Sequence, residues 1–225
     1  MAYPTIAAPY GLKPINLIGG QVFAGATRLL NIASGYNTSI FYGDVVKLVS
    51  TGTIQKDTGQ ATATPCGVFL GCSYVNAQGQ TVFAQYFPAN TTAPTGTSIT
   101  AYVADDPDQL FKAVLVAGNT EDGNGLTPAY LGRTLIGTNA ELVQNTGSTI
   151  TGDSKVGVYT DGNTNNATLP IRIIDVVPDT ANSSGNFVEV ICKWNAPYVV
   201  SASDGGVTTT STVTGGHQYL NPVGV

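Results

Sequence analysis

The sequence predicts an all-β protein, a β-barrel or jelly-roll-like sandwich with an extended N-terminal arm and a C-terminal tail. Three observations support this fold class. Strand-forming Val and Thr alternate with turn-forming residues, among them 27 glycines. No apolar run keeps a helical period for more than about eight residues. Charged residues make up only 10% of the chain, against about 25% in an average domain, which indicates an exterior largely covered by other protein.

The predicted arm covers residues 1–20 and is marked by proline. Pro4, Pro9 and Pro14 rule out a helix and an inner strand. The residues between them are too apolar for a free disordered segment. We therefore expect an extended segment that either wraps its own domain or reaches onto a neighbouring subunit.

Residues 21–200 form the predicted β body, which has the length of one large β domain or two small ones. Apolar runs bounded by turn residues predict strands at 21–24, 27–32, 39–42, 45–49, 53–55, 68–75, 81–87, 98–104, 110–116, 140–144, 156–159, 169–177 and 187–194. The strongest hairpin signal is the turn at 76–79, and the segment 128–135 has the pattern of one or two helical turns. No internal repeat of fixed length is visible.

The predicted flexible tail, residues 201–225, begins with a Ser, Thr, Val and Gly spacer, a composition that is flexible or strand-like in isolation. It regains apolar residues from His217 to Val225. Such a segment could add to the edge of a neighbour's sheet, where main-chain hydrogen bonds supply the affinity.

The charge balance excludes two classes of partner. The chain has 9 basic and 14 acidic residues, a net charge of -5, and the basic residues are scattered, so we expect no nucleic-acid and no anionic-membrane surface. No apolar run reaches the roughly 18 residues of a membrane span. The first residues lack the pattern of a signal peptide, so we expect synthesis in a reducing cytoplasm and no glycosylation at Asn37, Asn90, Asn166 or Asn182.

No residue pattern predicts catalysis, a cofactor or a metal site. His217 is the only imidazole, and nothing near it suggests a catalytic triad. The spacing of Cys66, Cys72 and Cys192 fits neither disulfides nor zinc, so we expect buried thiols.

Three acidic segments are candidate sites. We interpret Asp105–Asp108 as a solvated turn, with a cation site as the alternative. A glycosidase pair at Asp105–Asp108 or Glu121–Asp122 would need a cleft lined with aromatic side chains, and Trp194 is the only Trp. The segment 161–166 begins like a calcium loop, but Asn166 and Arg172 stand where that loop needs Gly and Glu. We expect a protein that is not an enzyme.

Several stretches together resemble virion structural proteins of tailed bacteriophages, especially head decoration or cement proteins. They are strand and turn patterns without reactive residues: Gly11–Val22, Phe41–Leu48, Gly67–Tyr74, Ala104–Asp108, Leu135–Ala140 and Arg172–Pro178. The resemblance implies a small β-barrel or jelly-roll-like body, often trimeric, seated on the outer surface of the capsid and bound to the major capsid protein.

From the apolar arms and this resemblance we expect a non-enzymatic protein that cements neighbouring capsomers. The expected protein-interface residues are the large apolar side chains of the two ends: Tyr3, Tyr10, Leu12, Ile15, Leu17, Ile18, Tyr219 and Leu220. The alternatives are a tail, baseplate or fibre subunit and a carbohydrate-binding jelly roll.

Overall fold

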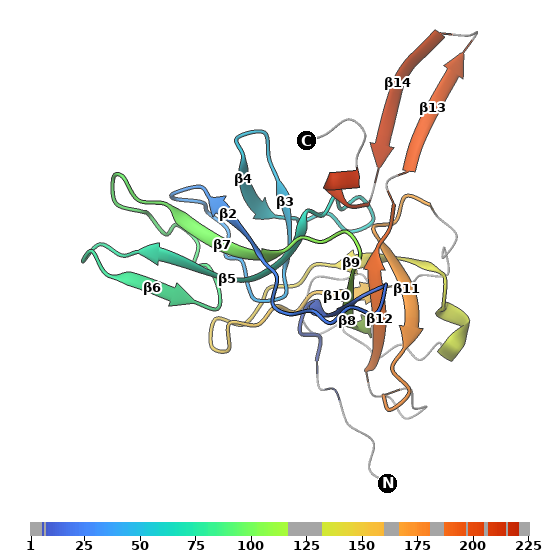
Figure 1. Ribbon diagram of the computed structural model, residues 1–225, viewed down its shortest axis with the longest axis horizontal. Coiled ribbons are helices and arrows are strands. Elements are labelled where there is room, and N and C mark those ends of the chain that lie inside the picture. The colour runs from blue at the N-terminus through green and yellow to red at the C-terminus, as the bar shows by residue number, and fades with distance from the viewer. Residues whose placement is uncertain are drawn as a thin grey trace.

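The computed structural model describes residues 6, 8–116, 132–159, 167–180, 187–196, 198–204, 207–214 and 216–220. The described residues form strands and two short 3₁₀ helices, η1 (Gly132–Leu135) and η2 (Gln218–Leu220). The predicted all-β class is confirmed. Most of the body is built as two small barrels that lie side by side (Figure 1).

The first barrel closes through five strands. Its members are β2 (Arg28–Ile32), β3 (Val45–Leu48), β4 (Thr53–Lys56), β5 (Gly67–Val75) and β7 (Ile99–Ala104). They pair in the order β3-β4-β2-β7-β5, and a further β3–β5 pairing closes the ring. The additional strand β6 (Thr81–Ala84) extends the predicted hairpin from β5.

The second barrel also closes through five strands. They are β8 (Gln109–Val116), β9 (Asn139–Val143), β10 (Gly157–Tyr159), β11 (Ile171–Val176) and β12 (Val188–Trp194). The order β8-β10-β9-β11-β12 is closed by a β8–β12 pairing. The additional strand here is β1 (Lys13–Leu17), which pairs with β8.

The two barrels share one topology. Strands β2, β3, β4, β5 and β7 correspond in order to β8, β9, β10, β11 and β12, and each corresponding pairing has the same polarity. The β2–β4 and β8–β10 pairings are parallel and the other four in each ring are antiparallel. The chain is therefore a tandem structural repeat.

The registers of the two barrels agree as well as the strand order does. Matching cross-strand pairs are Ile32–Ile99 with Leu115–Val188, Leu48–Ile54 with Leu142–Val158, and Val46–Gly67 with Ala140–Ile171. Equivalent residues are not a constant number of positions apart, because the connecting loops differ in length. A search for a repeat of fixed length therefore cannot detect this one.

Equivalent backbone bonds fix equivalent bends. Phe69 accepts a bond from the N–H of Gly43 (2.8 Å) and donates to the carbonyl of Asp44 (2.9 Å). In the second barrel Ile173 accepts from Gly137 (2.9 Å) and donates to Thr138 (2.9 Å). A register shift follows at the same place on β5 and β11, as a bulge produces.

The apolar cores are equivalent position by position. Eight buried residues of the first barrel match eight of the second: Ile32 with Leu115, Val46 with Ala140, Ile54 with Val158, Phe69 with Ile173, Cys72 with Val176, Ile99 with Val188, Ala101 with Val190, and Val103 with Cys192. Most of the paired positions differ in side-chain size, so the two interiors are packed differently.

The chain leaves the second barrel as a hairpin. Strands β13 (Tyr198–Asp204) and β14 (Val207–Thr214) pair with each other, and Figure 1 shows them projecting away from both barrels. The boundary expected at residue 201 thus falls inside β13, and described residues of the expected flexible tail form a strand pair. Residues 216–220 then return to the body.

Candidate functional site

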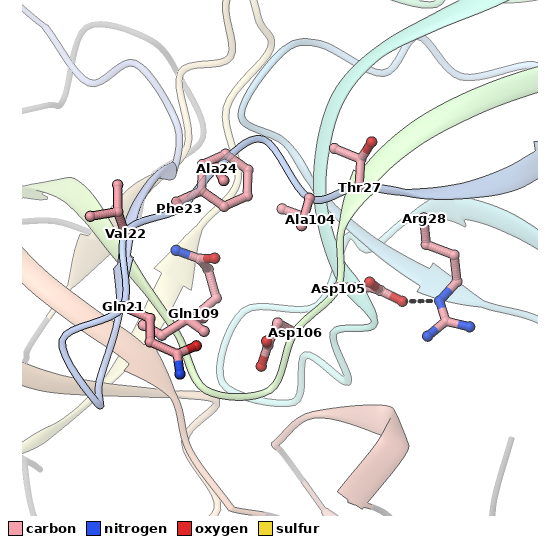
Figure 2. Close-up of a pocket in the computed structure, with 12 residues that line it drawn as sticks. Gln21, Val22, Phe23, Ala24, Thr27, Arg28, Ala104, Asp105, Asp106 and Gln109 are labelled. Atoms are coloured by element: carbon pink, nitrogen blue, oxygen red, sulfur yellow. Dashed lines mark hydrogen bonds and ion pairs between the residues drawn. The ribbon is translucent and has the colours of Figure 1, made fainter.

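A cavity of about 450 Å³ lies where the first and second barrels meet. The N-terminal segment lines it, and the C-terminal segment contacts its wall through a hydrogen bond from Tyr219 to Asp105. Figure 2 shows residues from the β1–β2 connection on one side and the turn between β7 and β8 on the other. Its lining is Leu17, Gln21–Ala24, Ala26–Arg28, Ala104–Asp106 and Gln109.

The N-terminal side of this site is fixed by β1. Strand β1 pairs antiparallel with β8, with Lys13 opposite Lys112 and Leu17 opposite Gln109. Pro14 can take part because β1 lies at the end of the sheet order rather than inside it. Described residues of the expected arm therefore wrap their own chain, the first of the two alternatives.

A buried carboxylate anchors the segment that precedes β1. The hydroxyl of Tyr10 donates to Glu189 Oε1 (2.5 Å), and Lys112 Nζ lies 3.0 Å from the same oxygen. Burial, followed by the hydrogen bond to Glu189, raises the pKa of Tyr10 above its ordinary value. Tyr10 is therefore a neutral hydrogen-bond donor that holds the arm to β12 and β8.

Leu12 was expected at a protein interface, but the structure places it in the core. Its side chain has no exposed surface and belongs to a core cluster that fills the second barrel and also includes Val45 and Val68 of the first. Gly11 donates to the carbonyl of Val156 (3.1 Å) and Leu12 to that of Gly43 (3.0 Å), so the backbone is held between the two barrels. Leu12 is a core residue because these bonds turn its side chain inward.

The C-terminal side of the site is centred on Asp105. Its carboxylate forms an ion pair with Arg28 and accepts a 2.9 Å hydrogen bond from the hydroxyl of Tyr219. The guanidinium of Arg28 lies 5.3 Å from the centre of the Tyr219 ring, within the range of a cation–π contact. Cys66 Sγ lies 3.5 Å from the same hydroxyl. Tyr219 thus joins the C-terminal segment to the first barrel.

His217 and Gln218 extend this attachment to both barrels. The His217 ring is fully buried and lies 6.1 Å from Trp194 of β12. The Gln218 side chain accepts from the N–H of Leu48 (2.7 Å) and donates to its carbonyl (3.1 Å), like an added strand residue. Burial lowers the pKa of His217 to about 4, so the imidazole is neutral at pH 7.

The other expected interface residues fall into three groups. Tyr3 lies outside the described residues, and Ile15 and Leu17 are half-buried in β1. Ile18, Tyr219 and Leu220 have 50%, 40% and 49% of their surface exposed. Of these residues, Leu17 lines the cavity, and Tyr219 is bonded to Asp105 of its wall.

Sequence reasoning missed Val22, Arg28 and Asp105 as parts of this site. Val22 is 77% exposed and forms a bridge with Asn16 across the turn that contains Ile18. The Gly19–Gly20 pair beside these apolar residues was the available signal for an exposed apolar turn. The Arg28–Asp105 pair had no such signal, since 77 positions separate the two residues.

The polar groups of the cavity wall are largely engaged within the chain. Gln109 Nε2 donates to the carbonyls of Asn16 (3.0 Å) and Leu110 (2.9 Å). The Asp106 carboxylate accepts a hydrogen bond from the N–H of Asp108 (2.8 Å), and the Asp106 backbone carbonyl accepts one from the N–H of Gln109 (3.1 Å). These bonds confirm the predicted turn. The arrangement suits the seating of an apolar side chain better than it suits proton transfer.

The remaining expected sites are the three cysteines and the other acidic segments. Cys66, Cys72 and Cys192 are free and buried, as predicted, and burial raises each thiol pKa, to about 11, 12 and 12. Within the part of the chain that the structure describes, no three His, Cys, Asp or Glu residues gather as metal ligands. Glu121, Asp122 and the 161–166 segment lie outside that part.

Comparison with protein families, curated proteins and solved structures gives no match for this chain. Among the described residues no helix has the length and apolar character to span a membrane.

Proposed function

We propose that this protein is a non-enzymatic structural component of a virion, which binds the outer surface of a tailed-phage capsid and cements neighbouring capsomers. The observation that carries the proposal is that the N-terminal segment lines a cavity between the two barrels while the C-terminal segment is bonded to Asp105 in its wall, with exposed apolar side chains on both segments. The capsid itself, the major capsid protein as partner and a trimeric state come from the resemblance to decoration proteins.

The rim of the cavity has the character of a protein-binding surface. Val22 lines it, and the adjoining turn carries exposed Ile18. Tyr219 and Leu220 lie exposed on the segment attached to Asp105. A partner that inserts an apolar side chain here would remove these groups from water, at a gain of about 25 cal/mol per Å² of apolar surface.

The tandem architecture suits a clamp. Two closed barrels joined by the β1 segment and the 216–220 segment present fixed surfaces, so little conformational entropy is lost on binding. Several modest contacts made by one rigid body reinforce each other, because release of one leaves the others engaged. A seam between capsomers needs this kind of linked attachment.

The proposal is tested with capsids prepared without this chain. Purified protein is mixed with them and sedimented, and the bound amount and the temperature of capsid disruption are measured. We expect saturable binding and a higher disruption temperature. The double variant Ile18→Ser, Val22→Ser should bind more weakly, whereas the control Ile150→Ser, at a 95% exposed side chain remote from the cavity lining, should not.

Absence of binding by the folded wild-type chain would overturn the capsid assignment. Tubes or rings of the chain alone would instead support a tail subunit, and glycan binding by the monomer would support a carbohydrate-binding module.

A further inference from the structure

The two barrels differ at one pair of equivalent strands, β8 and β2. In the second barrel, the side of β8 that faces β10 has two partners. Strand β10 pairs with Leu115 and Val116, and β1 pairs with the earlier stretch from Gln109 to Lys112. Both ends of β8 therefore have a strand partner on this side.

The equivalent side of β2 has one partner among the described strands. Strand β4 pairs with Asn31 and Ile32, the equivalents of Val114 and Leu115. The equivalents of Phe111 and Lys112 are Arg28 and Leu29, and no described strand pairs with them on this side. The first barrel therefore lacks the strand that β1 supplies to the second.

The side chains of this unpaired stretch are exposed to solvent. Leu29 has 62% of its surface exposed, and the Arg28 side chain 60%. Phe111, the equivalent of Arg28, has none. An unpaired strand edge with an exposed apolar residue is a template for β-addition.

The same chain carries a candidate donor for that edge. Strands β13 and β14 form a two-stranded sheet of their own and pair with no other described strand. A two-stranded hairpin is marginally stable alone, whereas three or more strands with a packed face can be stable. Figure 1 shows the hairpin directed away from the β2 edge of its own chain, so a second copy is the natural acceptor.

We propose that the β13–β14 hairpin of one copy adds, antiparallel to β2, to the open Arg28–Leu29 edge of a second copy. The added strand would occupy the place that β1 occupies beside β8. Donor and acceptor surfaces differ, so the contact is heterologous and produces a ring or an open chain. A ring of three copies is one closed form, with each copy giving one hairpin and receiving one.

Two variants separate donor from acceptor. Leu29→Lys places a charge on the acceptor edge, as natural edge strands do to prevent addition. The double change Thr210→Pro, Ser211→Pro disrupts the donor, because adjacent strand residues direct their N–H groups to opposite sides and both are removed. Phe83→Lys is the matched control, at a 74% exposed residue of β6, the strand that ends the order of the same sheet.

Sedimentation velocity over a concentration series measures the result. We expect the wild type and Phe83→Lys to associate equally, and each of the other two variants to associate about tenfold more weakly or not at all. An equimolar mixture of these two variants should form a 1:1 dimer and nothing larger, since it contains one working donor and one working acceptor.

Circular dichroism and thermal unfolding establish that each variant keeps its barrels. A wild-type chain that stays monomeric at its highest soluble concentration would overturn the proposal. Loss of association in Phe83→Lys alone would also overturn it, by moving the acceptor to β6, as would a mixture that gives no dimer. The proposal does not depend on capsid binding, because no capsid is present in this experiment.

Discussion

The hydroxyl of Tyr219 donates a 2.9 Å hydrogen bond to Asp105, 114 positions earlier in the chain, and so fastens the C-terminal segment across the boundary between the barrels. Arg28 completes the group through its ion pair with the same carboxylate. From the sequence, this C-terminal segment was expected to contact a neighbouring subunit. The exposed face of Tyr219 remains available to a partner while its hydroxyl is engaged within the chain.

Removal of that hydroxyl should loosen the C-terminal segment while the barrels stay folded. Tyr219→Phe loses a hydrogen bond to a charged acceptor, at a cost of about 1–2 kcal/mol. We expect faster proteolytic cleavage between residues 204 and 216, measured as the rate at which the shortened fragment appears. Tyr102→Phe, which loses a hydroxyl contact with Ser73 away from this segment, is the control. Equal cleavage rates in Tyr219→Phe and wild type would contradict a fastening role for the bond.

Acid should destabilise the chain through His217. Burial lowers its pKa to about 4 in the folded state, against about 6.5 when unfolded. The unfolded chain therefore binds more protons between these values, and stability falls as the pH drops from about 6.5 towards 4. The full effect of such a shift is about 3 kcal/mol.

The matched variant for this pH dependence is His217→Gln. The free energy of unfolding is measured by urea at pH 7 and pH 4.5 for both proteins. The wild type should lose about 2–3 kcal/mol more than the variant over this interval. Identical losses in both proteins would show that carboxyl groups alone carry the acid sensitivity.

A buried ion pair should be among the most sensitive positions. Asp44 is fully buried, with Lys56 Nζ 3.1 Å away and a 2.6 Å hydrogen bond from Ser154 of the second half of the chain. Lys56→Met keeps the apolar stem but leaves the carboxylate without its cation. We expect a loss of about 3–5 kcal/mol in urea unfolding. Lys47→Met, whose side chain is 33% exposed and lies 3.9 Å from Asp57, should cost less, because the Asp57 carboxylate keeps its N–H bonds from Gly59 and Thr64. A similar cost for both variants would contradict this account.

The two equivalent glycines should respond differently to alanine. Gly43 and Gly137 both have positive φ, 91° and 85°, so each substitution strains the backbone by about 1–2 kcal/mol. A Cβ at Gly43 would also lie 3.0 Å from the Tyr10 carbonyl oxygen and 3.2 Å from Gly11, whereas nothing lies within 4 Å at Gly137. Gly43→Ala should therefore lower the melting temperature more than Gly137→Ala. The reverse order would show that contacts from the arm do not crowd Gly43.

Much of the fold was determined by the sequence itself. Alternating apolar residues and turn signals predicted the runs that became β2 to β12, because a half-buried strand needs that local pattern. The 68–87 hairpin and the 105–108 turn are similarly local. The burial of the three cysteines followed from composition, and no long-range information was needed for any of these features.

The tertiary structure decided how those strands close and what the chain ends do. Ring closure depends on pairings such as β8 with β12, whose register the local pattern does not encode. The repeat was hidden because loops of unequal length separate equivalent strands. Leu12 and Ile18 are both apolar residues of one short segment, yet backbone bonds to Gly43 and Val156 turn Leu12 into the core and leave Ile18 half exposed. Hydrophobicity marks a residue for burial, but only the positions of distant strands determine whether its own chain supplies the cover.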